Sequence, residues 1–114
     1  MKHFYIDTKT VKDFDFLKVY SVTEYDEVVL FFQGKSLNLG VDGFKLLIMS
    51  GFNFDLEDVK GSEESSLYFN IIARLSISKL NSNDRYYIVT NSKEVKENIK
   101  IALDYLVKNT ETSI

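Results

Sequence analysis

The chain has no cysteine and no proline among its 114 residues, and it has no long hydrophobic run. The lack of cysteine excludes disulfides and thiolate metal sites and fits a reducing compartment. The lack of proline excludes a proline-rich docking segment or a rigid linker. No stretch approaches the roughly 20 apolar residues of a membrane span, and the start of the chain shows no signal peptide. We therefore expect a soluble, cytoplasmic protein without a membrane partner.

The chain also has little net charge and none of the common nucleotide-binding motifs. Its net charge of −3 does not indicate a broad basic surface, so we expect a protein partner rather than nucleic acid. The segment Gly34-Lys35-Ser36 ends like a phosphate loop, but Val29 stands where that motif needs glycine. No glycine fingerprint follows the first apolar run, which argues against a dinucleotide site. The single histidine, His3, lies away from the carboxyl end of that run, so we expect it to be structural rather than catalytic.

Three short apolar runs are present, and each ends in small polar or acidic residues. They cover residues 3–6, 28–32 and 86–89, and segments with helical spacing lie between them. Residues 53–59 alternate apolar and acidic side chains, which is typical of an edge strand with one wet face. The order βαβαβαβα predicts an α/β fold: a three-layer α/β/α sandwich of about four mostly parallel strands with right-handed crossover helices. Polar side chains would then gather at the carboxyl ends of the strands, where such sheets bind ligands.

The same patterns predict the boundaries of the elements. We expect strands at residues 3–7, 27–32, 53–59 and 85–90, and helices at residues 11–20, 41–50, 61–80 and 93–107. Ser62 is expected to cap the third helix, and Asn91 or Ser92 the last one. Residues 1–108 are predicted to form one domain, and residues 109–114 a polar tail that frays.

Several of these features together resemble the PIN-like (NYN-type) nuclease superfamily. They are an aspartate at the end of the first strand, a long helix introduced by a glycine-containing loop, and Tyr-Tyr-Ile-Val before a polar turn. The resemblance covers residues 4–103 and implies a PIN-like sandwich. Members of that superfamily hydrolyse RNA with a divalent metal held by three or four carboxylates, because Mg²⁺ and Mn²⁺ prefer oxygen ligands and activate water beside a phosphate. The resemblance therefore implies a metal site at the strand ends.

Most acids of that superfamily are replaced in this chain. Where the superfamily reads Asp-Tyr-Glu-Asn after the first strand, residues 7–10 read Asp-Thr-Lys-Thr. Where its third helix reads Asn-Ala-Leu-Asp-Phe, residues 65–69 read Ser-Ser-Leu-Tyr-Phe, so that Tyr68 stands in place of the acid. Where it reads Ser-Lys-Asp after the fourth strand, residues 90–92 read Thr-Asn-Ser. Only Asp7 is retained, and a lone carboxylate holds Mg²⁺ poorly.

Two interpretations of the remaining polar residues stay open. Glu64 lies four residues before Tyr68 on one helix face, and it could join Asp7 and the Ser92 hydroxyl in holding a divalent metal. The simpler interpretation, which we favour, is that Glu64 serves the start of its helix, where the dipole stabilises acids. Asp7 would then cap the turn that follows it.

The sequence thus predicts a protein without a firm catalytic residue. The leading hypothesis is a non-catalytic PIN-like binding module that regulates or inhibits a partner protein, such as a mobile-element inhibitor of a host nuclease of the anti-CRISPR type. One alternative is a divalent-metal-dependent ribonuclease with the rearranged site. The other is a protein that binds Mg²⁺ or Mn²⁺ weakly without turnover.

The densest negative patch supplies the candidates for binding a partner. It comprises Asp55, Glu57, Asp58, Glu63 and Glu64, and the first four are the candidates for contacting a partner. Such a patch could face a basic partner, although acidic residues more often keep an edge strand soluble. A stripe formed by Lys93, Lys96 and Lys100 is expected to be a solvated face, because Glu94 and Glu97 dilute its charge.

Overall fold

The computed structural model describes residues 1–33, 40–49, 53–61, 63–77, 83–106 and 110–113, and strands and helices alternate through these residues. The elements are β1 (Lys2–Asp7), α1 (Phe16–Val19), β2 (Glu27–Gln33), α2 (Gly40–Met49), β3 (Asn53–Val59), α3 (Glu64–Ile77), β4 (Arg85–Val89), α4 (Lys93–Leu106) and β5 (Thr110–Ser113). Each predicted strand is present within two residues of its predicted bounds. Among these helices, none is long and apolar enough to cross a membrane.

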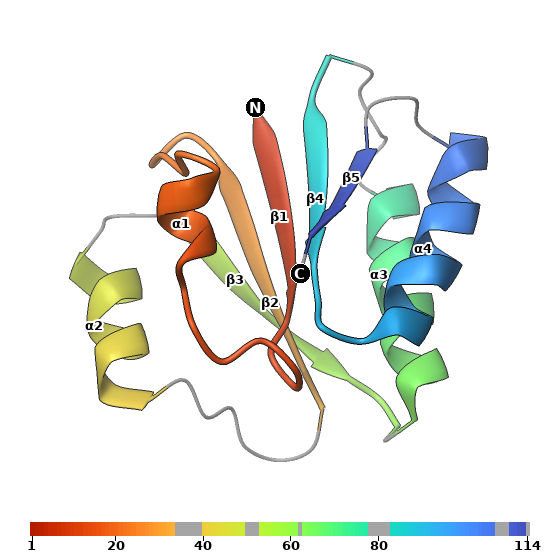
Figure 1. The fold of residues 1–114 in the computed structure, drawn as a ribbon, viewed down its shortest axis with the longest axis horizontal. Helices are drawn as coiled ribbons and strands as arrows, with labels where there is room; N and C mark the ends of the chain where they lie inside the picture. Colours follow the sequence, from red (N-terminus) through yellow and green to blue (C-terminus); the bar gives the residue numbers. More distant parts are fainter. Residues whose placement is uncertain (34–39, 50–52, 62, 78–82, 107–109, 114) are drawn as a thin grey trace.

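The strands form one parallel sheet in the order β3-β2-β1-β4-β5. Figure 1 shows α1 and α2 on one side of this sheet and α3 and α4 on the other. This arrangement confirms the α/β class and fits the predicted three-layer sandwich. The chain runs outward from β1 to β2 and β3, and then returns to place β4 on the other side of β1. Ligands of open parallel sheets bind at such a reversal point, at the carboxyl ends of the two central strands.

Both faces of the central strands are buried, because successive side chains of a strand point to opposite sides of the sheet. On the α1 side, Phe4, Ile6, Val28 and Leu30 pack with α1 and the segment before it. On the other side lies a second apolar cluster. It contains Tyr5, Val29, Phe31, Val59, Leu67, Ile71, Leu75, Tyr86, Ile88, Val95 and Ile99. Two-sided burial explains the unbroken apolar run of β2.

Two predicted boundaries are wrong. The helix expected at residues 11–20 is a single turn, α1, although Val11 and Phe14 before it are still buried. The polar tail, expected to fray, contributes β5, which pairs with β4 and gives the sheet five strands instead of about four. The proposed cap Ser62 and the predicted end of the third helix lie outside the described residues.

Candidate functional site

Asp7 lies at the carboxyl end of β1, where β1 adjoins β4, and its side chain is completely buried. Its carboxylate accepts three hydrogen bonds. Oδ2 accepts from the hydroxyls of Thr10 at 2.8 Å and Thr90 at 2.7 Å, and Oδ1 accepts from the amide of Lys9 at 3.1 Å. The bond from Lys9 confirms the prediction that Asp7 caps the turn after β1. Both carboxylate oxygens are therefore already engaged.

The two threonine hydroxyls also accept hydrogen bonds, so they connect the turn after β1 to the turn after β4. Thr10 Oγ1 accepts from the amide of Asn91 at 2.9 Å, and Thr90 Oγ1 accepts from the amide of Ser92 at 3.0 Å. The Asn91 side chain adds a bond from Nδ2 to the carbonyl oxygen of Thr10 at 2.9 Å. We call Asp7, Thr10, Thr90 and Asn91 the tip network. It lies at the place where an open parallel sheet would offer a ligand site.

The residues at this point do not fit a divalent metal. A Mg²⁺ or Mn²⁺ site needs several oxygen ligands with free lone pairs, whereas Asp7 is buried and occupied by hydroxyl and amide donors. The Ser92 hydroxyl accepts a hydrogen bond from the amide of Val95 at 3.3 Å, which confirms that Ser92 caps the start of α4. Glu64 is the first residue of α3, but its side chain lies outside the described part of the structure. No group of three or more histidine, cysteine or acidic residues that could hold a metal occurs among the described residues.

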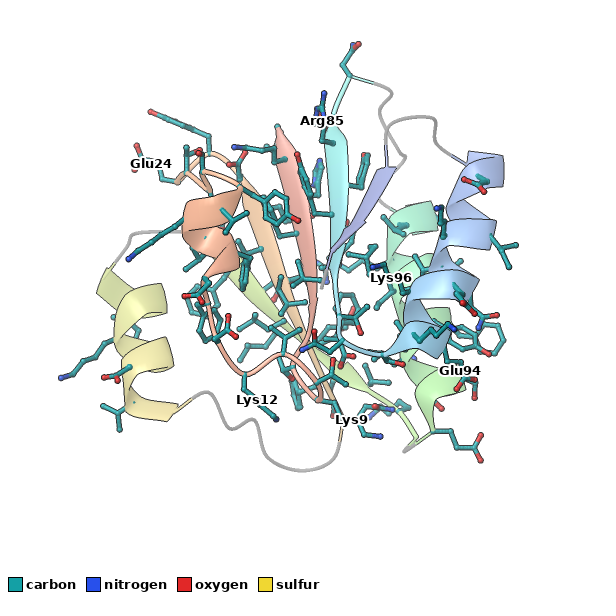
Figure 2. The ribbon with its side chains drawn as sticks, viewed as in Figure 1. Lys9, Lys12, Glu24, Arg85, Glu94 and Lys96 are labelled. Carbon is teal, nitrogen blue, oxygen red and sulfur yellow. The ribbon has the colours of Figure 1, made fainter. Side chains whose placement is uncertain are left out.

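A pocket of about 430 Å³ lies next to the tip network, where β4 leads into α4. It is lined by residues 90–93 with Lys96, Glu97 and Lys100. Lys93 lies 3.9 Å from Glu97, so the lysine stripe carries mixed charge, as the sequence predicts. Figure 2 shows Lys9 and Lys12 in the loop after β1, near this end of the sheet, whereas Arg85 lies at the opposite end. The Lys12 ammonium donates to the carbonyl oxygen of Thr8 at 2.9 Å, so it is held by the backbone of this loop.

The acidic residues of β3 are partly compensated by one arginine from α3. Arg74 lies 3.0 Å from Asp55, 3.3 Å from Glu57 and 3.7 Å from Glu27 of β2. Partial burial disfavours its charge, but the hydrogen bonds and charges of these carboxylates outweigh burial and raise its pKa. Asp58 has only a weak contact with Lys60 at 4.0 Å, and Glu63 is exposed. One guanidinium is thus shared by three carboxylates.

His3 lies at the other end of β1 and bridges two carboxylates. Nδ1 is 2.9 Å from Glu27 and Nε2 is 2.8 Å from Asp84, and the ring stacks on Tyr86 with centroids 4.5 Å apart. Burial opposes protonation, but the hydrogen bonds and charges of Glu27 and Asp84 outweigh it and raise the pKa of His3. The hydrogen bond with His3 is the main cause that lowers the pKa of Glu27 and of Asp84. These contacts fit the predicted structural role.

This arrangement predicts that the contribution of His3 to stability falls as pH rises through its raised pKa. A histidine with a raised pKa in the folded state stabilises fully below its unfolded pKa, near 6.5. That contribution is lost as pH rises through the folded pKa. Urea unfolding between pH 6 and pH 9 measures this. The free energy of unfolding of the wild type should exceed that of His3→Gln by most at pH 6, and this advantage should shrink as pH rises. An advantage that is independent of pH would show that folding leaves the pKa of His3 unchanged, and an advantage that grows with pH would show that the imidazole is neutral in the folded protein.

The comparisons with known proteins give no relative. No protein family matches this sequence, and no curated protein or solved structure matches it. The resemblance to PIN-like nucleases therefore stays a prediction. Sequence reasoning identified Asp7 but not its partners Thr10 and Thr90. The signal for them was their place near the ends of two predicted strands that become neighbours, since Thr90 is the last residue of one and Thr10 lies three residues after the other.

Proposed function

We propose that this protein is a non-catalytic binding module that regulates or inhibits a partner protein. One observation carries the proposal: Asp7, the one acid that matches the PIN-like pattern at the strand ends, is buried and accepts hydrogen bonds on both carboxylate oxygens, from Lys9, Thr10 and Thr90. If the chain derives from a PIN-like nuclease, hydroxyls have taken the place that a metal and a substrate phosphate would need. The core is kept, so the fold would have been retained for a purpose other than phosphodiester hydrolysis.

The features that support a partner are on the outer surface. The edge strand β3 exposes the apolar side chains of Phe54 and Leu56 beside acidic residues. Exposed apolar groups next to charge are a recurring feature of protein interfaces. We propose another protein as the partner, and an inhibitor of a nuclease, such as a mobile-element protein that acts on a CRISPR effector, as the concrete form to test.

This proposal predicts that the protein neither cleaves RNA nor binds manganese. Incubation of labelled single-stranded RNA with the protein and Mn²⁺ or Mg²⁺ should give no cleavage, because Asp7 is buried and both of its carboxylate oxygens already accept hydrogen bonds. Calorimetry should detect no heat of binding at millimolar Mn²⁺. The melting temperature should be the same with Mn²⁺ and with a chelator.

Two results would favour the alternatives. Cleavage that needs Mn²⁺ and is lost in both Asp7→Asn and Glu64→Gln would establish a ribonuclease with the rearranged site. A rise in melting temperature with Mn²⁺, without cleavage, would establish a metal-binding protein without turnover. Inhibition of a purified candidate nuclease by stoichiometric amounts of the protein would support the proposed function directly.

A further inference from the structure

We infer that the edge of β3 that faces away from β2 is a docking site for an extended, basic segment of the partner protein, which adds to the sheet as a further strand. The inference rests on the proposed function, since it specifies how the partner would be bound. Strand addition at a sheet edge obtains affinity from main-chain hydrogen bonds and specificity from alternate side chains.

The backbone of β3 has hydrogen-bonding groups that point away from β2, and an added strand would take over the bond that the Leu56 amide now makes to a side chain. β3 is at the end of the strand order, and within the described residues its one neighbour is β2, with which it pairs over all seven of its residues. The amide of Leu56 donates to the side chain of Asp55 at 3.0 Å, so this amide points away from β2. Amides two residues apart in a strand point the same way, so those of Phe54 and Asp58 share this direction.

The apolar side chains of β3 continue a buried core. Phe54 and Leu56 lie beside Val28 and Leu30 of β2 in the sheet register, and those two residues are fully buried. Phe54 and Leu56 are themselves 36% and 49% exposed. Apolar side chains of an added strand would lie beside them and extend the same layer, which the hydrophobic effect favours.

The charge of this edge selects a basic segment. The side chains of Asp55 and Asp58 are 61% and 55% exposed, and Arg74 divides its charge among three carboxylates. The only other cation close to these carboxylates in the described part of the chain is Lys60, which is 89% exposed and 4.0 Å from Asp58, so it compensates little. Lysine or arginine side chains of an added strand would therefore meet uncompensated acids.

The same charges disfavour a second copy of this chain at the edge. Two β3 strands paired about a two-fold axis centred on Leu56 would place Asp55 opposite Glu57 of the other copy. Like charges directly opposite each other destabilise a strand pair. The edge is therefore suited to a different, basic chain.

Two synthetic peptides as long as β3, with blocked ends, test the inference. One alternates lysine and valine, and the other alternates glutamate and valine. Titrated into the ¹⁵N-labelled protein, the lysine peptide should shift the amide signals of residues 53–59. It should bind at least about tenfold more tightly than the glutamate peptide, and should weaken as salt rises from about 50 to about 500 mM.

Matched variants at Leu56 separate strand addition from simple charge attraction. Leu56→Pro and Leu56→Ala both remove the leucine side chain, but only proline also removes the outward amide. Proline is tolerated on edge strands where the N–H faces solvent. Leu56→Pro should bind the lysine peptide at least about tenfold more weakly than Leu56→Ala. If its melting curve shows that Leu56→Pro is unfolded, the pair Asp58→Pro and Asp58→Ala makes the same comparison.

The inference is overturned if proline and alanine variants bind the peptide equally, if both peptides bind equally, or if the shifts lie outside β3. These failures differ from failure of the proposed function. If the wild type and the Leu56→Pro variant inhibit a nuclease equally well, the proposed function stands and this docking site is ruled out. A protein that cleaves RNA would lose the proposed function, whatever the peptides do.

Discussion

Replacement of Asp7 by alanine should lower the free energy of unfolding by about 3–5 kcal/mol. The change removes a fully buried carboxylate that accepts from two threonine hydroxyls and the Lys9 amide, and the bond from Thr90 is itself buried. Buried donors that lose their acceptor cost about 1–3 kcal/mol each, and rotation of the hydroxyls recovers part of this. Urea unfolding of the wild type and the variant at pH 7 measures the difference.

The sign of this effect distinguishes a structural aspartate from a metal ligand. A carboxylate that serves as a metal ligand often destabilises the folded protein when the metal is absent. Its replacement by a neutral residue then leaves the free energy of unfolding unchanged or raises it. Asp7→Asn keeps one acceptor oxygen, so it should lower the free energy of unfolding less than Asp7→Ala does, by about 1–3 kcal/mol. Glu24→Ala, which removes an exposed carboxylate, is the control and should change stability by less than about 0.5 kcal/mol. A neutral or stabilising Asp7→Ala would contradict the structural role.

The sequence predicts the sheet well because burial on two faces leaves a strong signal. The unbroken apolar run of β2 and the alternation in β3 correspond to a central and an edge strand. Tyr86 and Tyr87 are consecutive in β4 and lie in the two different apolar clusters, one on each face of the sheet. In each case a local pattern reports directly on what the strand packs against.

The parts that were missed depend on contacts that the local pattern does not contain. Phe14 and Leu17 have helical spacing, yet Phe14 is buried without a helix, because an aromatic ring can fill the core from an irregular segment. β5 has no apolar residue, and the strand is defined by pairing with β4. Thr90 lies 83 residues from Asp7, so their hydrogen bond follows only once the strand order is known.

The contact of Arg74 with β3 leads to a second prediction with a large effect. Arg74→Gln should lower the free energy of unfolding by about 1–2 kcal/mol, because carboxylates of β2 and β3 lose their shared cation and repel one another. Solvent screening of Asp55 and Glu57 keeps the effect below that of a fully buried pair. The same substitution makes the β3 edge more negative.

Arg74→Gln should therefore bind the lysine-valine peptide about three- to tenfold more tightly than the wild type, even though it is less stable. Arg74→Lys keeps the positive charge but lacks the planar fork that reaches two carboxylates, so it should lose part of the stability and leave the affinity unchanged. Unfolding curves and peptide titrations on the same three proteins measure both quantities. Arg74→Gln and the wild type binding the peptide equally well would show that the guanidinium does not compete with a basic strand for these acids.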